Sequence, residues 1–269
     1  MSAPLVDTHA HLDDPAFDAD RAEVLARAKA AGVRAIVNVG YNPERIRTTL
    51  ALAEAEPIVY AAVGLHPTEA ERLSPDVLAA IREAARHPKV VAIGEIGLDY
   101  HHQTASREAQ VRAFRAQLDL ARELGLPVII HNRDAHDDVY ALLREADAGA
   151  IGGVMHAFSG SEAHVEAAVA LGFYLSLGGP VTFKNARALQ ALVPRIPLDR
   201  LVIETDAPYL APHPYRGRRN ESAHVRLVAE AVARLAGRSV EEIAHLSTDN
   251  AKRLFRLPSP DAPPDHGMG

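Results

Sequence analysis

The feature that most restricts the fold of this chain is a series of short apolar runs that each end at a histidine or a carboxylate. The series begins with LVDTHAH near the N-terminus, continues with VVAIGE, PVIIH and GGVMH, and finishes with LVIETD about 200 residues later. Runs this short and apolar are typical of strands that are buried on both faces. Because parallel strands bring their carboxyl ends to one edge, we expect these polar residues to share a site.

Longer amphipathic segments separate the apolar runs. The expected strands are 4–9, 33–39, 58–64, 90–95, 127–131, 151–156, 173–177 and 201–205. The expected helices are 18–31, 43–55, 75–86, 105–124, 135–147, 161–171, 184–193 and 222–236. Eight β/α units in 269 residues predict an α/β fold, a TIM (β/α)8 barrel with a metal site at the C-terminal face of the strands.

The end of the chain follows a different pattern. Residues 239–256 predict two short helices, the second of them capped by Ser247 or Thr248. Residues 1–256 are therefore expected to form a single barrel domain. Residues 257–269 are rich in Pro, Gly and Asp, which predicts a flexible C-terminal tail.

Composition excludes several kinds of protein. With no cysteine, the chain has neither disulfides nor thiolate ligands, so a metal would bind through histidine and carboxylates. No apolar stretch approaches the roughly 20 residues of a membrane span, and no signal peptide is visible, so the cytoplasm is the expected compartment. A net charge of −6 argues against a broad nucleic-acid-binding surface but leaves room for local phosphate contacts.

Two histidines and a glutamate are the first candidate ligands. His9 and His11 are two residues apart on one strand, so their side chains share a face. Glu95 stands in IGEIG, where a buried carboxylate is costly unless it is paired or bound to metal. A salt bridge to arginine is the alternative for Glu95. Because a carboxylate can bridge two cations, we expect Glu95 to be a bridging ligand.

Three later residues complete the candidate set. His131 and His156 each end a strand, although either one alone is more often a core histidine bonded to backbone. Asp206 ends the last strand and is expected both to ligate metal and to take the proton of an attacking water. We therefore expect Asp206 and Glu95 to be catalytic.

The six candidates are enough for two divalent ions. One ion would be held by His9, His11, Glu95 and Asp206, and a second by Glu95, His131 and His156. Nitrogen and oxygen donors favour Zn²⁺ or Mn²⁺, and Mg²⁺ less readily.

Motifs along nearly the whole chain resemble those of the TatD family of metal-dependent deoxyribonucleases, within the amidohydrolase-like barrel superfamily. They are VDTHAHLDD (6–14), VGLHP (63–67), IGEIGLDY (93–100), HNRDA (131–135), HAFSG (156–160), VTFKNA (181–186), ETDAPYL (204–210), RGRRNE (216–221) and NAKRLF (250–255). The resemblance implies a TIM barrel with two metal ions held by the same six residues. It also implies 3′→5′ exonuclease activity on DNA, supported by Mg²⁺ or Mn²⁺ with Zn²⁺ as another occupant, and a role in DNA repair.

The chain departs from the family pattern at a few positions. Ala157 replaces a common cysteine, Asn132 replaces serine or threonine, and Ser222 replaces proline. Gly179 belongs to LGGP, where a serine-containing turn is more usual. None of these changes removes a ligand. We expect Asn132 and Gly179 to lie near the site and to affect substrate preference.

For each candidate substrate contact, the sequence leaves a second, structural role open. His66 in GLHP is expected to bind phosphate or to stabilise the turn before Pro67. Arg133 is expected to pair with phosphate or to form an ion pair with Asp134 or Glu95. Asp99 is expected only to shape the loop after Glu95.

The segment HPYRGRRNE is the one dense basic stretch. Such a stretch is often a solvated face, but it follows the last strand, where (β/α)8 enzymes frequently bind phosphate. Arg216, Arg218 and Asn220 are the predicted phosphate or sugar contacts, and Tyr209 and Tyr215 are predicted to stack on a base.

Together these expectations describe a phosphodiesterase with two divalent ions that acts on DNA, on single strands or at 3′ ends, with no obligate protein partner. A metal-dependent amidohydrolase or esterase acting on a small or aminoacyl substrate is the first alternative. A scaffold with a vestigial site is the second.

Overall fold

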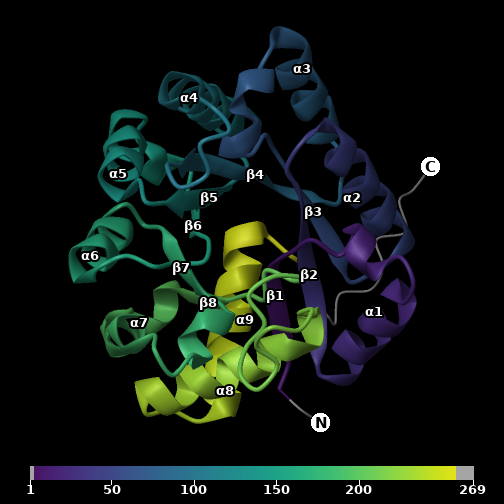
Figure 1. Cartoon of the computed structure of the whole chain (residues 1–269), viewed down its shortest axis with the longest axis vertical. Helices are drawn as coiled ribbons and strands as arrows, with labels where there is room; N and C mark the ends of the chain where they lie inside the picture. Colours follow the sequence, from purple (N-terminus) through teal and green to yellow (C-terminus); the bar gives the residue numbers. More distant parts are fainter. Residues whose placement is uncertain (1–2, 259–269) are drawn as a thin grey trace.

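Eight parallel strands form the centre of the computed structural model, which describes residues 3–258 (Figure 1). The strands are β1 (Leu5–Ala10), β2 (Val33–Gly40), β3 (Val59–Val63), β4 (Val90–Asp99), β5 (Val128–Arg133), β6 (Gly153–Met155), β7 (Tyr174–Leu177) and β8 (Leu201–Ile203). Each strand pairs with the next one along the chain, so the order is β1-β2-β3-β4-β5-β6-β7-β8. The predicted TIM barrel is confirmed.

A helix follows each strand and covers the outside of the barrel, as Figure 1 shows. These helices are α1 (Arg21–Ala30), α2 (Pro43–Ala55), α3 (Pro75–Ala84), α4 (Arg107–Leu124), α5 (His136–Glu145), α6 (Glu162–Ala170), α7 (Arg187–Leu192) and α8 (Val225–Ala236). Local signals set their ends. The Ser106 side chain accepts a hydrogen bond from the amide of Ala109 at the start of α4, and Gly125 adopts a left-handed φ of 65° at its end.

The barrel closes where the C-terminal ends of β1 and β8 meet. Ala10 and Ala207 form a parallel bridge. The amide of Asp206 donates to the carbonyl of His9 at 2.8 Å, and the amide of His11 donates to the carbonyl of Ala207 at 2.7 Å. Residues almost 200 positions apart therefore lie side by side at the mouth of the barrel.

A ninth helix, α9 (Val240–Phe255), closes the opposite end. Its apolar residues pack against the side chains that fill the barrel interior, a cluster that includes Val6, Val37, Ala92, Ile129, Val202, Leu254 and Phe255. The two predicted short helices are thus wrong, because α9 is continuous. Ser239 is its N-cap, whereas Ser247 and Thr248 are buried and bond backbone carbonyls of Ala244 and Pro4.

Strand β4 runs four residues further than predicted, to Asp99. Its last residues pair with β5, from Ile96 opposite Ile130 to Asp99 opposite Arg133. Gly97 allows this close approach, since a Cβ there would lie 2.0 Å from the His131 carbonyl oxygen. The extension carries Asp99 to the mouth of the barrel.

Two further expectations concern the chain as a whole. Among residues 3–258 there is no helix with the length and apolar character that crossing a bilayer requires. The predicted tail, 257–269, lies outside the described residues except for Leu257 and Pro258.

Candidate metal centre

A cavity of about 420 Å³ opens at the C-terminal face of the barrel. Side chains from β1, β4 and β5, and from the residues that follow β3, β6 and β8, reach into it or lie beneath it. The structure brings together all six residues predicted as ligands: His9, His11, Glu95, His131, His156 and Asp206. They come from five separate strands, at or just beyond the strand ends except for Glu95, which lies within the extended β4.

His9, His11 and Asp206 form the first group of donors. The Nε2 atoms of His9 and His11 are 3.3 Å apart. The Oδ1 atom of Asp206 lies 3.7 Å from Nε2 of His9 and 3.5 Å from Nε2 of His11. Asp206 has a left-handed φ of 58°, which is uncommon outside glycine and asparagine, and such backbone is frequent at functional sites.

Glu95 lies between the histidines and presents a different oxygen to each side. Its Oε2 is 3.4 Å from Nε2 of His9. Its Oε1 is 2.6 Å from Nδ1 of His131 and 3.5 Å from Nε2 of His156. This carboxylate is buried and has contacts suited to a bridging role.

His131 is held between two carboxylates. Its Nδ1 faces Glu95, while its Nε2 lies 2.9 Å from Oδ2 of Asp99. Asp99 is thus part of the site and does more than shape a loop. The sequence did not predict this role, because Asp99 follows Gly94 and Gly97, which suggest that the strand has already ended.

His156 has a similar arrangement with Glu204. The Oε1 atom of Glu204 lies 2.9 Å from Nδ1 of His156 and also accepts a hydrogen bond from the amide of Ala157. Glu204 was not predicted as a site residue. The available signal was LVIETD, in which two carboxylates, at 204 and 206, end the same apolar run.

The buried acids and imidazoles shift each other's pKa values. Burial alone would raise the pKa of Glu95, but the surrounding histidines hold it well below its usual range. Burial lowers the pKa of His9. For His156, burial acts in the same direction but is outweighed by Glu204 and Glu95, so the pKa is raised. The carboxylates are therefore anionic and attract positive charge to this position.

The geometry fits a divalent cation. Donors that bind one ion at about 2.1 Å and about 100° from each other lie about 3.2 Å apart. The observed separations of 3.3–3.7 Å around His9, His11 and Asp206 are close to this value. The described residues that line the cavity include no lysine or arginine, so no side-chain ammonium or guanidinium neutralises the acids.

The grouping of donors differs from the predicted partition. The atoms cluster as His9–His11–Asp206, His9–Glu95–His156 and His66–Glu95–His131. His156 therefore lies with His9, on which its ring stacks at 3.6 Å between centroids. His131 lies instead with His66, a residue that spacing alone did not place among the donors.

His66 makes the turn contact that was one of its two predicted roles, and it also meets the donor cluster. Its Nδ1 accepts a hydrogen bond from the amide of Thr68 at 3.2 Å, which stabilises the turn after Pro67. Its Nε2 lies 3.2 Å from Nδ1 of His131 and 3.6 Å from Glu95. The turn thus holds the ring against the donor cluster and in the wall of the cavity.

Of the other predicted substrate contacts, the structure places Tyr209 in the wall of the cavity and the rest outside it. Arg133 and Arg218 are exposed, and within residues 3–258 neither has an ion pair. Arg216 places its guanidinium 4.3 Å from the centroid of Phe183. Tyr209 lines the cavity and is 52% exposed. Tyr215 stacks on His224 at 4.3 Å and does not line the cavity.

Asn220 is not placed to contact a substrate. Its side chain is fully buried, and its amide nitrogen donates to the carbonyls of Thr205 and Tyr209. Its oxygen accepts a hydrogen bond from the amide of Glu221. Asn220 therefore fixes the backbone on which Asp206 and Tyr209 are carried.

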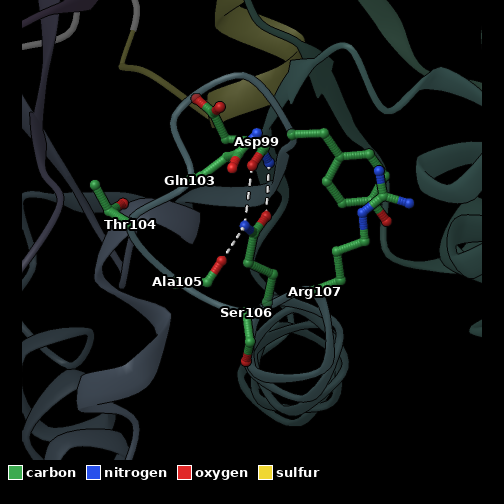
Figure 2. A pocket seen from close by; sticks show the side chains of 8 residues that line it. Asp99, Gln103, Thr104, Ala105, Ser106 and Arg107 are labelled. Atoms are coloured by element: carbon green, nitrogen blue, oxygen red, sulfur yellow. Dashed lines mark hydrogen bonds between the residues drawn. The ribbon is translucent and has the colours of Figure 1, made fainter.

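A second cavity, of about 440 Å³, shares Asp99 with the first. Figure 2 shows the side chains that line it. It lies under the loop that joins β4 to α4. Its wall includes Tyr100, Thr104, Ser106 and Arg107, and the Arg107 guanidinium stacks 4.0 Å from the Tyr100 ring centroid.

Comparison with known proteins shows which family the chain belongs to. Residues 6–256 match the family model described as TatD related DNase. A Bacillus subtilis (strain 168) protein named as an uncharacterized metal-dependent hydrolase, YabD, is 50% identical over 94% of this chain and 99% of its own length. A protein of Erwinia billingiae (strain Eb661), named 3′-5′ ssDNA/RNA exonuclease TatD, is 38% identical over 95% of this chain and all of its own.

The fold comparison gives the same result. The crystal structure of YJJV, a TatD homologue from Escherichia coli K12, superposes with a TM-score of 0.90 at 36% identity, covering 96% of this chain and 100% of that one. The chain therefore belongs to the family of TatD-related DNases, which are metal-dependent hydrolases.

Proposed function

We propose that this chain is a 3′→5′ exonuclease that hydrolyses phosphodiester bonds of single-stranded DNA with two divalent ions at the cluster around Glu95. The observation that carries the proposal is the position of Glu95, which presents one oxygen to His9 and the other to His131 and His156. A single carboxylate shared in this way suits two adjacent ions. When bound, such ions supply the positive charge that acidifies a water and stabilises a leaving oxygen.

The residues of the chain supply the rest of the chemistry. Asp206 is anionic because His11, His156 and His9 outweigh the effect of burial and lower its pKa. A carboxylate at this position takes the proton of the attacking water. Tyr209, exposed at the rim, offers a face on which the terminal base stacks. Arg133 and Arg218 contribute positive charge around the mouth of the barrel.

The relatives support the same substrate class. The Erwinia billingiae protein carries single-stranded DNA and RNA in its name, and so does a protein of Pantoea vagans (strain C9-1) that is 38% identical. Both align with more than nine tenths of this chain.

The test is digestion of a 5′-labelled single-stranded DNA by metal-stripped protein that is resupplied with Mg²⁺, Mn²⁺ or Zn²⁺. A duplex, a single-stranded RNA of the same sequence and a circular single strand are run in parallel. Stepwise shortening of the linear DNA, with the circle left intact, is the expected result. Asp206→Asn should lower kcat about 10²–10⁴-fold with little change in KM.

Asp119→Asn, an exposed substitution on α4, is the matched control and should retain full activity. Cleavage of the circle would replace exonuclease with endonuclease action. Faster cleavage of RNA would change the substrate. If metal-loaded protein cleaves none of these but hydrolyses small amides, lactones or aminoacyl esters, the proposal is wrong.

A further inference from the structure

Asp99 connects the metal centre to a second histidine at the edge of the cavity. Its Oδ2 lies 2.9 Å from Nε2 of His131 and also 2.9 Å from Nδ1 of His102. Its Oδ1 accepts hydrogen bonds from the amides of His101 and His102 at 3.0 and 2.7 Å.

His102 has the position and the free atom that proton transfer requires. It lines the same cavity as Glu95, His131 and Asp206. Its side chain is 58% exposed, and it belongs to none of the three donor clusters. With Nδ1 occupied by Asp99, Nε2 is the ring nitrogen that remains for a substrate.

The loop that carries His102 is fixed at both ends. The buried side chain of Gln110 accepts a hydrogen bond from the amide of Asp99 and donates to the carbonyls of Asp99 and Ala105 (Figure 2). Thr104 also donates to the carbonyl of Thr68, beyond β3. These bonds fix the loop on both sides of His102, and the contact of Nδ1 with Asp99 orients the ring, so the group is positioned before any substrate arrives.

The barrel places His102 and Asp206 on opposite sides of the cavity. Asp206 follows β8 and His102 follows β4, and the strands run in order from β1 to β8 around the barrel. In phosphoryl transfer the attacking and leaving oxygens lie roughly in line on opposite sides of phosphorus. If the water is beside Asp206, the leaving oxygen is on the side of β4.

We propose that His102 is the general acid that protonates the departing 3′ oxygen, and that Asp99 is its positioning residue. The proposal rests on the proposed nuclease function. The water oxygen bonds to phosphorus as the bond from phosphorus to O3′ breaks, and the proton of the water passes to Asp206. The proton on Nε2 of the His102 imidazolium passes to O3′, which leaves as a hydroxyl. Exchange with solvent then restores both residues.

The second cavity supports this direction of departure. It shares Asp99 with the first cavity and is lined by Gln103, Thr104 and Ala105 of the loop that carries His102, so the shortened strand has space to occupy there. Arg107, on its wall, has no ion pair with an acid in the part of the chain that the structure describes. A phosphate of the strand would be attracted to this cation.

The experiment compares two leaving groups on one nucleotide. Thymidylyl-(3′→5′)-thymidine releases an alkoxide that needs a proton, whereas thymidine 5′-(p-nitrophenyl phosphate) releases a phenolate that does not. Both substrates are given to the wild-type protein and to His102→Ala and His102→Gln. His87→Ala is the matched control, because His87 pairs with Glu54 on the surface and lines neither cavity.

His102→Ala and His102→Gln should lower kcat for the dinucleotide about 10²–10⁴-fold and leave kcat for the nitrophenyl ester close to that of the wild type. Metal content, measured by mass spectrometry, should equal that of the wild type in every variant. An equal loss on both substrates would make His102 a binding or structural residue and overturn the inference. No loss on either substrate would overturn it too. If the wild type cleaves neither substrate, the proposed nuclease function fails first and the inference fails with it.

Discussion

The carboxylate of Glu204 lies 2.9 Å from Nδ1 of His156, on the edge of the ring opposite the Nε2 that faces Glu95. Both residues are buried, and the amide of Ala157 donates to the same glutamate oxygen. A carboxylate in this position fixes the orientation and the tautomer of a histidine that binds metal. Glu204 thus acts on the site through His156.

Glu204→Gln should weaken metal binding about 10–100-fold, because the amide holds the ring less firmly and does not make it more basic. Titration calorimetry with Mn²⁺ or Zn²⁺ measures the effect directly. Glu166→Gln, an exposed change on α6, is the matched control. An affinity equal to the wild type would show that Glu204 serves the fold alone.

Divalent ions should stabilise the folded protein, because the donor atoms come together only in the closed barrel. At an ion concentration about 100 times Kd, the free energy of unfolding rises by about 2.7 kcal/mol. For a chain of this size, that corresponds to a Tm increase of about 5–10 °C by calorimetry. The increase should shrink in His11→Ala and persist in His87→Ala, whose histidine pairs with Glu54 on the surface. A Tm that does not change when divalent ions are added would contradict the proposed metal centre.

Asp7 should make the metal-free protein less stable as the pH rises. Burial raises the pKa of Asp7 from 3.8 to about 7, although hydrogen bonds from Thr205 act in the opposite direction. Between these values the folded chain keeps the proton and the unfolded chain releases it. The free energy of unfolding therefore falls as the pH rises from about 4 to about 7, by about 4 kcal/mol in total.

Asp7→Asn removes this titration and can still accept a hydrogen bond from the amide of Thr205. Relative to the wild type, the variant should gain about 2–3 kcal/mol of unfolding free energy between about pH 5 and about pH 8. Denaturant unfolding of both proteins, without metal, gives the difference. A constant difference across this range would mean that Asp7 is ionised throughout.

Tyr209 should contribute to DNA binding through stacking. It is 52% exposed and lines the cavity, and one stacked base is worth about 1–3 kcal/mol. Tyr209→Ala should therefore raise KM for single-stranded DNA about 10-fold with a smaller change in kcat. Tyr215→Ala is the matched control, since Tyr215 stacks on His224 away from the cavity. Equal effects of the two changes would argue against a stacked base at Tyr209.

The barrel was predictable because most of the strands are short runs dominated by apolar residues and the segments between them carry helix signals. Convergence of the ligand candidates followed from the parallel arrangement, which brings His131, His156 and Asp206 to one end. The length of β4 was harder to predict, since Gly94 and Gly97 suggest a turn. In the structure Gly97 instead permits a close approach to the His131 carbonyl.

Residues that act through a neighbour were not predictable from spacing. Asp99 and Glu204 are ordinary acids in the sequence, and only the fold shows that each meets a histidine. Asn220, in contrast, was predicted to contact the substrate because it stands in a basic segment. In the structure its side-chain amide instead donates to backbone carbonyls that the turn after β8 leaves unpaired.

The junction between β1 and β8 determines when the site can first exist. His9 and His11 lie at the end of β1, whereas Asp206, their carboxylate neighbour, follows β8, so it is synthesised only after all eight strands. Until the backbone at Asp206 bonds to His9, a growing chain has unpaired strand edges and only part of the donor set. The proposed metal centre is thus completed only at the last step of barrel assembly, and a chain cut short before β8 lacks the carboxylate of Asp206.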